Sequence, residues 1–282
     1  MKTKALILIM ALLGFLATSC QKTSPIEEST AEAADDATFS ETIFDDVFAT
    51  VEIATATAES MLKSSTVTDS CPVVTVTFPG QALWPRNVVV DYGEGCTGLN
   101  DVVRSGKIYI TVTGPRREEG SMRTVTFDNY YCNDVKIEGT KVVENMGPNN
   151  AGNVVFSTVL TGGKVTLPDN KVIEREFDRE REYVAGYNTL TPWDDECMIT
   201  GVAAGVNLNG LTYTHQITNA LHWKAACRFI VSGTVGFEVE GLAPFVLDYG
   251  DGECDAVATL IRGDETREIT LGFRHRKIIP GK

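Results

Sequence analysis

The chain has 282 residues and a formal net charge of −13. This acidic balance argues against a nucleic-acid-binding surface, which needs a basic face, and against electrostatic attachment to anionic lipid. Residues 21–62 hold ten acids and one lysine, so a net charge of −9 in this stretch accounts for most of the acidity.

The N-terminus has the layout of a secretory signal peptide, with Lys2 and Lys4 before an apolar run over residues 5–16. That run is too short to span a bilayer. Ala17-Thr18-Ser19-Cys20 resembles a bacterial lipobox, with Ala17 where leucine is commonest. We expect residues 1–19 to be removed and Cys20 to be diacylated, which anchors the protein stably to the outer membrane. An ordinary signal peptide with a chance cysteine is the alternative.

A tether and a helix are predicted next. Residues 20–38 are rich in Ser, Thr, Ala and Glu and lack large apolar side chains apart from Ile26, so they predict a flexible acidic tether. Apolar residues then recur at helical spacing and predict an amphipathic helix over 39–63 that docks on the rest of the chain. Ser40 is expected to cap this helix, with Asp45 and Asp46 near its N-terminal end.

Residues 64–282 predict one β domain, because apolar residues alternate there with period two. Four β-branched or aromatic runs are expected to form strands: 107–113, 123–127, 153–160 and 211–218. Asn209-Gly210, Pro168-Asp169-Asn170 and Gly162-Gly163 are expected to reverse the chain. The fold class is therefore all-β, an antiparallel meander that forms a sandwich or a partly open barrel.

Two cysteine-bracketed segments, 71–96 and 227–254, repeat one pattern. Each opens on a cysteine, turns near its centre and closes on an Asp-Tyr-Gly-x-Gly sequence with a second cysteine, and an arginine follows eight residues after that closing cysteine. The oxidising envelope favours disulfides, and a hairpin folded about its own centre pairs Cys71 with Cys96 and Cys227 with Cys254. A Cys132–Cys197 bond follows by elimination, and buried reduced thiols are the alternative.

The closing turns suggest a structural role. Asp91 and Asp248 are expected to accept backbone N–H groups inside the turn, while the glycines supply positive φ. Calcium ligation by Asp91, Asp248 and Asp251 is the alternative, although their spacing does not match an EF-hand loop. We expect neither a metal nor a cofactor.

The charged run 174–183 is expected to be a strand, with a helix as the rival. Alternation places the acids on one face and Arg175, Phe177, Arg179, Arg181 and Tyr183 on the other. This second face could bind an acidic glycan or protein. A solvated surface or a guarded sheet edge is the favoured interpretation.

Catalytic motifs are almost absent, and the remaining candidates concern sugars. Asp194, Asp195 and Glu196 follow Pro192-Trp193 in a predicted exposed loop, and paired carboxylates could cleave glycosidic bonds across a cleft. Trp84, Trp193 and Trp223 could stack on sugar rings, although buried tryptophans are more common.

Four segments resemble those of a family of envelope lipoproteins from Bacteroidota-type bacteria: 90–98, 124–131, 227–235 and 247–254. The resemblance implies an envelope location and a β-rich fold, and it supplies no catalytic residue. Surface-exported members carry an acidic cluster after the lipidated cysteine, where this chain has Gln21-Lys22-Thr23. The cell surface and the periplasmic face therefore both remain open.

These observations favour a membrane-anchored envelope lipoprotein with a non-enzymatic binding or structural role, whose partner is a glycan or an envelope protein. The alternative is a glycan-binding module or a glycoside hydrolase of the envelope.

Overall fold

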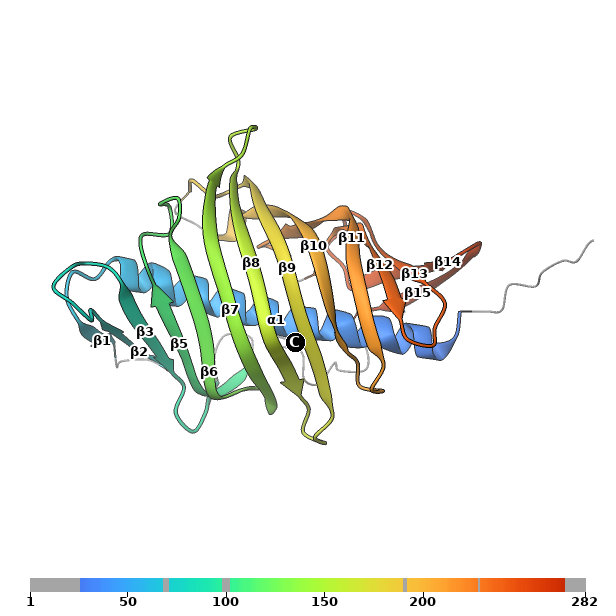
Figure 1. The fold of residues 1–282 in the computed structure, drawn as a ribbon, viewed down its shortest axis with the longest axis horizontal. Coiled ribbons are helices and arrows are strands. Elements are labelled where there is room, and N and C mark those ends of the chain that lie inside the picture. The colour runs from blue at the N-terminus through green and yellow to red at the C-terminus, as the bar shows by residue number, and fades with distance from the viewer. Residues whose placement is uncertain (1–25, 68–70, 98–101, 190–191, 228, 272–282) are drawn as a thin grey trace, which may run out of the picture.

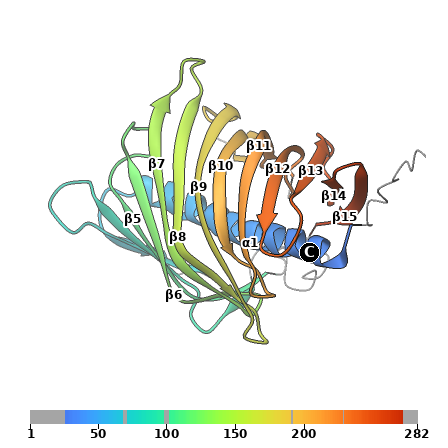
Figure 2. The same cartoon turned by 45° about the vertical axis from the view of Figure 1, so that its right-hand side comes forward.

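The computed structural model describes residues 26–67, 71–97, 102–189, 192–227 and 229–271. Within these ranges the chain forms one α-helix, α1 (Glu28–Glu59), and a single antiparallel sheet of fifteen strands. The sheet curves around α1, which runs across its inner face (Figures 1 and 2). The all-β antiparallel prediction is confirmed, and the sheet remains open because its edge strands β1 and β15 do not pair with each other.

The strands follow one another across the sheet in chain order, except that the short β4 pairs with β5 off this path. Their bounds are β1 (Ser65–Val67), β2 (Val73–Thr77), β3 (Arg86–Asp91), β4 (Cys96–Thr97), β5 (Val103–Val112), β6 (Met122–Cys132), β7 (Val135–Pro148), β8 (Val154–Thr166), β9 (Val172–Ala185), β10 (Glu196–Val206), β11 (Thr212–Lys224), β12 (Ser232–Val239), β13 (Phe245–Asp251), β14 (Val257–Arg262) and β15 (Glu265–Thr270). All four predicted runs lie in strands, namely β5, β6, β8 and β11, apart from one or two end residues.

The predicted boundary between tether and helix is wrong, because α1 already begins at Glu28 and ends at Glu59. Alanine is the strongest helix former, and the small side chains of Ala34 and Ala37 are buried against the sheet. Ser40 is consequently no cap. It lies inside the helix, where its Oγ donates to the Ala37 carbonyl at 2.9 Å.

The predicted docking of the helix on the β domain is confirmed. One stripe of α1 is buried and joins both hydrophobic cores of the molecule; it comprises Phe39, Ile43, Phe44, Val47, Phe48 and Val51. The 32-residue helix therefore acts as the axis that the sheet packs around. No helix among the described residues is long and apolar enough to cross a membrane.

Glycines at β-bulges let the strands bend over α1. Gly162-Gly163 does not reverse the chain as predicted but lies within β8, where the pairing with β9 shifts register between Leu160 and Gly163. A Cβ on Gly163 would lie 2.5 Å from the Arg175 carbonyl oxygen. Gly201 occupies a second shift, between β10 and β11, with a φ of +131°. Such bulges increase the local bend and twist of a sheet, so these glycines contribute to its curvature. The predicted reversals at Pro168-Asp169-Asn170 and Asn209-Gly210 do connect consecutive strands.

The charged run forms β9, and its two faces divide as predicted. Its environment is not as predicted, because the arginine face is buried against α1 instead of being solvated. Arg175, Arg179 and Arg181 are 0%, 3% and 3% exposed. Since β9 lies in the middle of the sheet, it is not an edge that needs guarding.

Both repeated segments are disulfide-closed hairpins, as predicted. Cys71 bonds to Cys96 beside β2 and β3, and Cys227 bonds to Cys254 beside β12 and β13. The expected third bond is wrong, since Cys132 and Cys197 are free and buried. These two residues lie on β6 and β10, four strand steps or about 19 Å apart in the sheet, which is too far for a disulfide.

Candidate functional site

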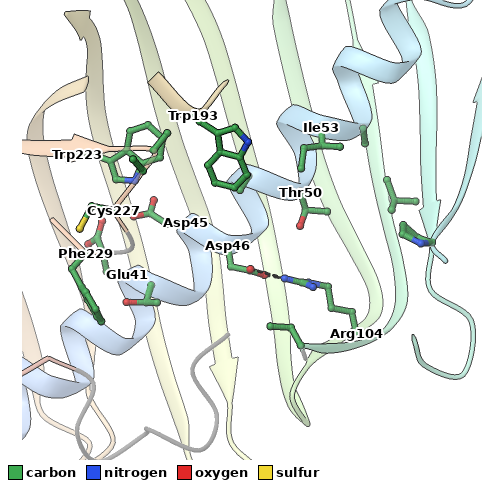
Figure 3. Close-up of a pocket in the computed structure, with 18 of the residues that line it drawn as sticks. Glu41, Asp45, Asp46, Thr50, Ile53, Arg104, Trp193, Trp223, Cys227 and Phe229 are labelled. Atoms are coloured by element: carbon green, nitrogen blue, oxygen red, sulfur yellow. Dashed lines mark hydrogen bonds and ion pairs between the residues drawn. The ribbon is translucent and has the colours of Figure 1, made fainter. Parts of the chain in front are cut away.

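A groove follows the side of α1 that faces away from the sheet. It has a volume of about 690 Å³, within the usual range for small-molecule sites. Its floor is a single face of α1, comprising Thr38, Glu41, Thr42, Asp45, Asp46, Ala49, Thr50, Ile53, Ala54 and Thr57. Six of these ten residues are threonine or alanine, and the groove lies above this face of the helix (Figure 3).

The two disulfide hairpins supply the walls of the groove. Cys71 and Tyr92 of the first hairpin line it, and Cys227 and Tyr249 of the second hairpin line it as well. Tyr92 and Tyr249 are the matching residues of the Asp-Tyr-Gly repeat, and both are buried. The duplication was visible in the sequence, whereas its consequence, two related walls around one helix, was not.

Two of the three predicted tryptophans meet at this groove. Trp193 lies on a 3₁₀ turn (Pro192–Asp194) and is 65% exposed, while Trp223 lies on β11. Both stand above α1 near Asp45, and Phe229 lies further along the same wall (Figure 3). Trp84 belongs elsewhere, because its ring packs on the guanidinium of Arg86, 4.0 Å from the ring centroid.

Three carboxylates of the floor form ion pairs with arginines of the sheet. Glu41 pairs with both Arg175 and Arg179. Asp45 pairs with Arg181 at 2.5 Å, and Asp46 pairs with Arg104 at 2.6 Å. The three carboxylate side chains are still 13–23% exposed, and all three line the groove. The Glu41 and Asp45 pairs join α1 to β9 and the Asp46 pair joins it to β5, so the floor is held at two places in the sheet.

Electrostatics keep Glu41 ionised. Burial acts to raise the pKa of its carboxyl group, but the guanidiniums of Arg179 and Arg175 outweigh this effect and hold the pKa well below its ordinary value. Glu52, further along α1, has a lowered pKa for the same reason beside Arg123 and Arg116.

A buried lysine of the sheet lies near these ion pairs. Lys141 on β7 is 2% exposed, and its Nζ lies 4.6 Å from the centre of the Phe48 ring. Burial lowers the pKa of Lys141 to about 7, and the charge of Arg181 acts in the same direction. Lys141 does not line the groove.

The predicted loop carboxylates adjoin the groove without lining it. Asp194 accepts the Thr189 hydroxyl at 2.8 Å, and Glu196 contacts His222 Nε2 at 2.7 Å. Burial raises the pKa of Asp195. The structure therefore does not bring these three carboxylates together with the tryptophans in the lining of one groove.

The predicted turn chemistry is confirmed in both copies. Asp91 Oδ1 accepts the Gly93 N–H at 2.8 Å, and Asp248 Oδ1 accepts the Gly250 N–H at 2.9 Å. Gly93 and Gly250 both have positive φ. Asp251 is exposed near the second turn. Among the residues that the structure describes, no three His, Cys, Asp or Glu side chains gather into a metal-binding group.

The predicted lipidation site, Cys20, lies outside the described residues.

The chain matches no family model, no curated protein and no solved structure.

Proposed function

We propose that this protein is a lipid-anchored, non-enzymatic binding protein of the cell envelope, and that the groove over α1 is its ligand site. The observation that carries the proposal is the exposed Trp193 beside Trp223 above an ion-paired helix floor. A large aromatic side chain that is left exposed at the mouth of a concave site is a common feature of binding surfaces. The signal-peptide pattern and Cys20 support the anchor.

The charges of the groove favour binding over catalysis. A general acid needs a pKa near the working pH, and the arginines hold the pKa of Glu41 far below that range. Asp45 and Asp46 are likewise engaged by Arg181 and Arg104. Such ion pairs suit a rigid surface that presents oxygen atoms to a ligand.

A groove-filling variant tests this function. Ala49 is exposed on the groove floor, and Ala56 is exposed two turns further along α1 outside the lining. We expect the full chain in lipid nanodiscs to bind at least one of the glycan, lipid or peptide fractions of its envelope in calorimetry. A49W should abolish this binding, and A56W should retain it.

The proposal is wrong if no fraction binds, if A49W and A56W behave alike, or if the bound compound is chemically converted over time. The anchor is checked separately with C20A, which should no longer incorporate a labelled fatty acid.

A further inference from the structure

We infer that the ligand of this groove is a neutral oligosaccharide, an inference that rests on the proposed function. The groove combines two features that sugars require together. Trp193 and Trp223 offer aromatic surface above the floor, and carboxylate oxygens of α1 lie below it.

The aromatic side of the groove fits the C–H faces of sugar rings. The face of an indole ring carries partial negative charge, which attracts the weakly positive C–H groups of a pyranose. Trp193 is 65% exposed, so one face is accessible without rearrangement of the core. Trp223 and Phe229 extend the aromatic surface along the same wall (Figure 3).

The floor selects for hydroxyl donors. Arg175, Arg179 and Arg181 are almost completely buried beneath the helix, whereas Glu41 and Asp45 are 13% and 23% exposed. A ligand in the groove therefore meets mainly acceptor oxygens. Hydroxyl groups can donate to ionised carboxylates in short, charge-assisted hydrogen bonds.

The same floor disfavours the other ligand classes. An acyl chain would remove water from Asp45, Asp46 and Arg104 and would supply no hydrogen bond in return. An anionic ligand would gain little, because the arginines of these pairs are at most 11% exposed and already bind the carboxylates. A cation would gain little, because each of these carboxylates is already neutralised by an arginine.

The length of the groove points to an oligomer. Its floor extends along α1 from Thr38 to Thr57, which is about 28 Å at the helical rise of 1.5 Å per residue. A monosaccharide would occupy only part of this distance, so several linked sugar units are needed to use both the tryptophans and the far end near Ile53.

Calorimetry with defined probes tests the inference. The full chain in nanodiscs is titrated with cellohexaose, xylohexaose, maltohexaose and chitohexaose, with oligogalacturonate as the anionic probe and octanoate as the acyl probe, and empty nanodiscs are subtracted. We expect at least one neutral hexaose to bind. W193A should weaken this binding by about fivefold or more, the size of an aromatic contact. Y109A, which removes an exposed aromatic ring on the outer side of β5, should not.

The inference fails if no neutral hexaose binds, if oligogalacturonate or octanoate binds more tightly, or if W193A and Y109A have equal effects. Octanoate binding that A49W abolishes and A56W retains would overturn the sugar assignment while supporting the binding function. Hexaose binding that survives both A49W and W193A would place the sugar site elsewhere and would also contradict the proposed function.

Discussion

β9 carries charged residues on both of its faces, and the two faces lie in opposite environments. On the outer face, Glu174 pairs with Lys164 at 3.0 Å while both side chains remain 48% exposed. On the inner face, Arg175 and Arg179 share Glu41 of α1 where little water reaches them. The same alternating sequence therefore produces a solvated surface on one side and the clamp for a helix on the other. The contribution of a charged side chain to stability therefore depends on whether water or α1 covers it.

The largest expected effect concerns the inner face. Glu41→Gln leaves Arg175 and Arg179 buried without their counter-charge, and breaking a buried pair in this way costs about 3–5 kcal/mol. We expect this loss in the free energy of unfolding, measured by urea denaturation. The matched control is Glu180→Gln on the exposed outer face of β9, which should change stability by less than about 0.5 kcal/mol. Equal losses in the two variants would mean that α1 is not clamped by these ion pairs.

An intermediate effect concerns Lys141 and depends on pH. The pKa of Lys141 falls from 10.5 to about 7 in the folded protein, so between these values the unfolded chain binds more protons than the folded one. Stability should therefore rise with pH in this window, by about 2 kcal/mol from pH 7 to pH 9. Lys141→Met should be more stable than wild type at pH 7, and its free energy of unfolding should rise less over this range. A wild-type stability that stays level or falls from pH 7 to pH 9 would contradict the lowered pKa.

The fold was predictable where the pattern of the sequence is local. Period-two alternation located the strands, and the twin cysteine segments gave both hairpins with their disulfides. The alternation in β9 also assigned each residue to its correct face. Local pattern could not show what lies on a face, and so the arginine face was wrongly expected in solvent.

The first eleven residues of α1, 28–38, were missed because large apolar residues were taken as a condition for burial. Ala34 and Ala37 are nevertheless buried in the second hydrophobic core together with residues of the strands, although their own side chains are small. A signal was nonetheless present, since α1 contains nine acids and no base while the strands carry an arginine-rich face. Complementary charge between the two segments would have predicted their contact.

The site was predictable only in part. Trp193 and Trp223 line the same groove, whereas Trp84 and the 194–196 carboxylates do not line it. The floor comes from α1, and the walls come from two hairpins, 71–96 and 227–254, that lie far apart in the sequence. Such a combination depends on the curvature of the whole sheet, which bulges such as that at Gly163 help to set.

The smallest expected effect is the coupling on the outer face of β9. A double-mutant cycle with Lys164→Ala and Glu174→Ala should give an interaction energy of no more than about 0.5 kcal/mol, because both groups are half exposed and screened by water. The same cycle on Glu41 and Arg179 should give a several-fold larger value, since their charges are desolvated together. Adding 1 M salt should remove most of the outer coupling and leave most of the inner one. Two equal couplings, or equal salt sensitivity, would mean that water screens the helix clamp as well, and the rigid floor on which the groove depends would lose its physical basis.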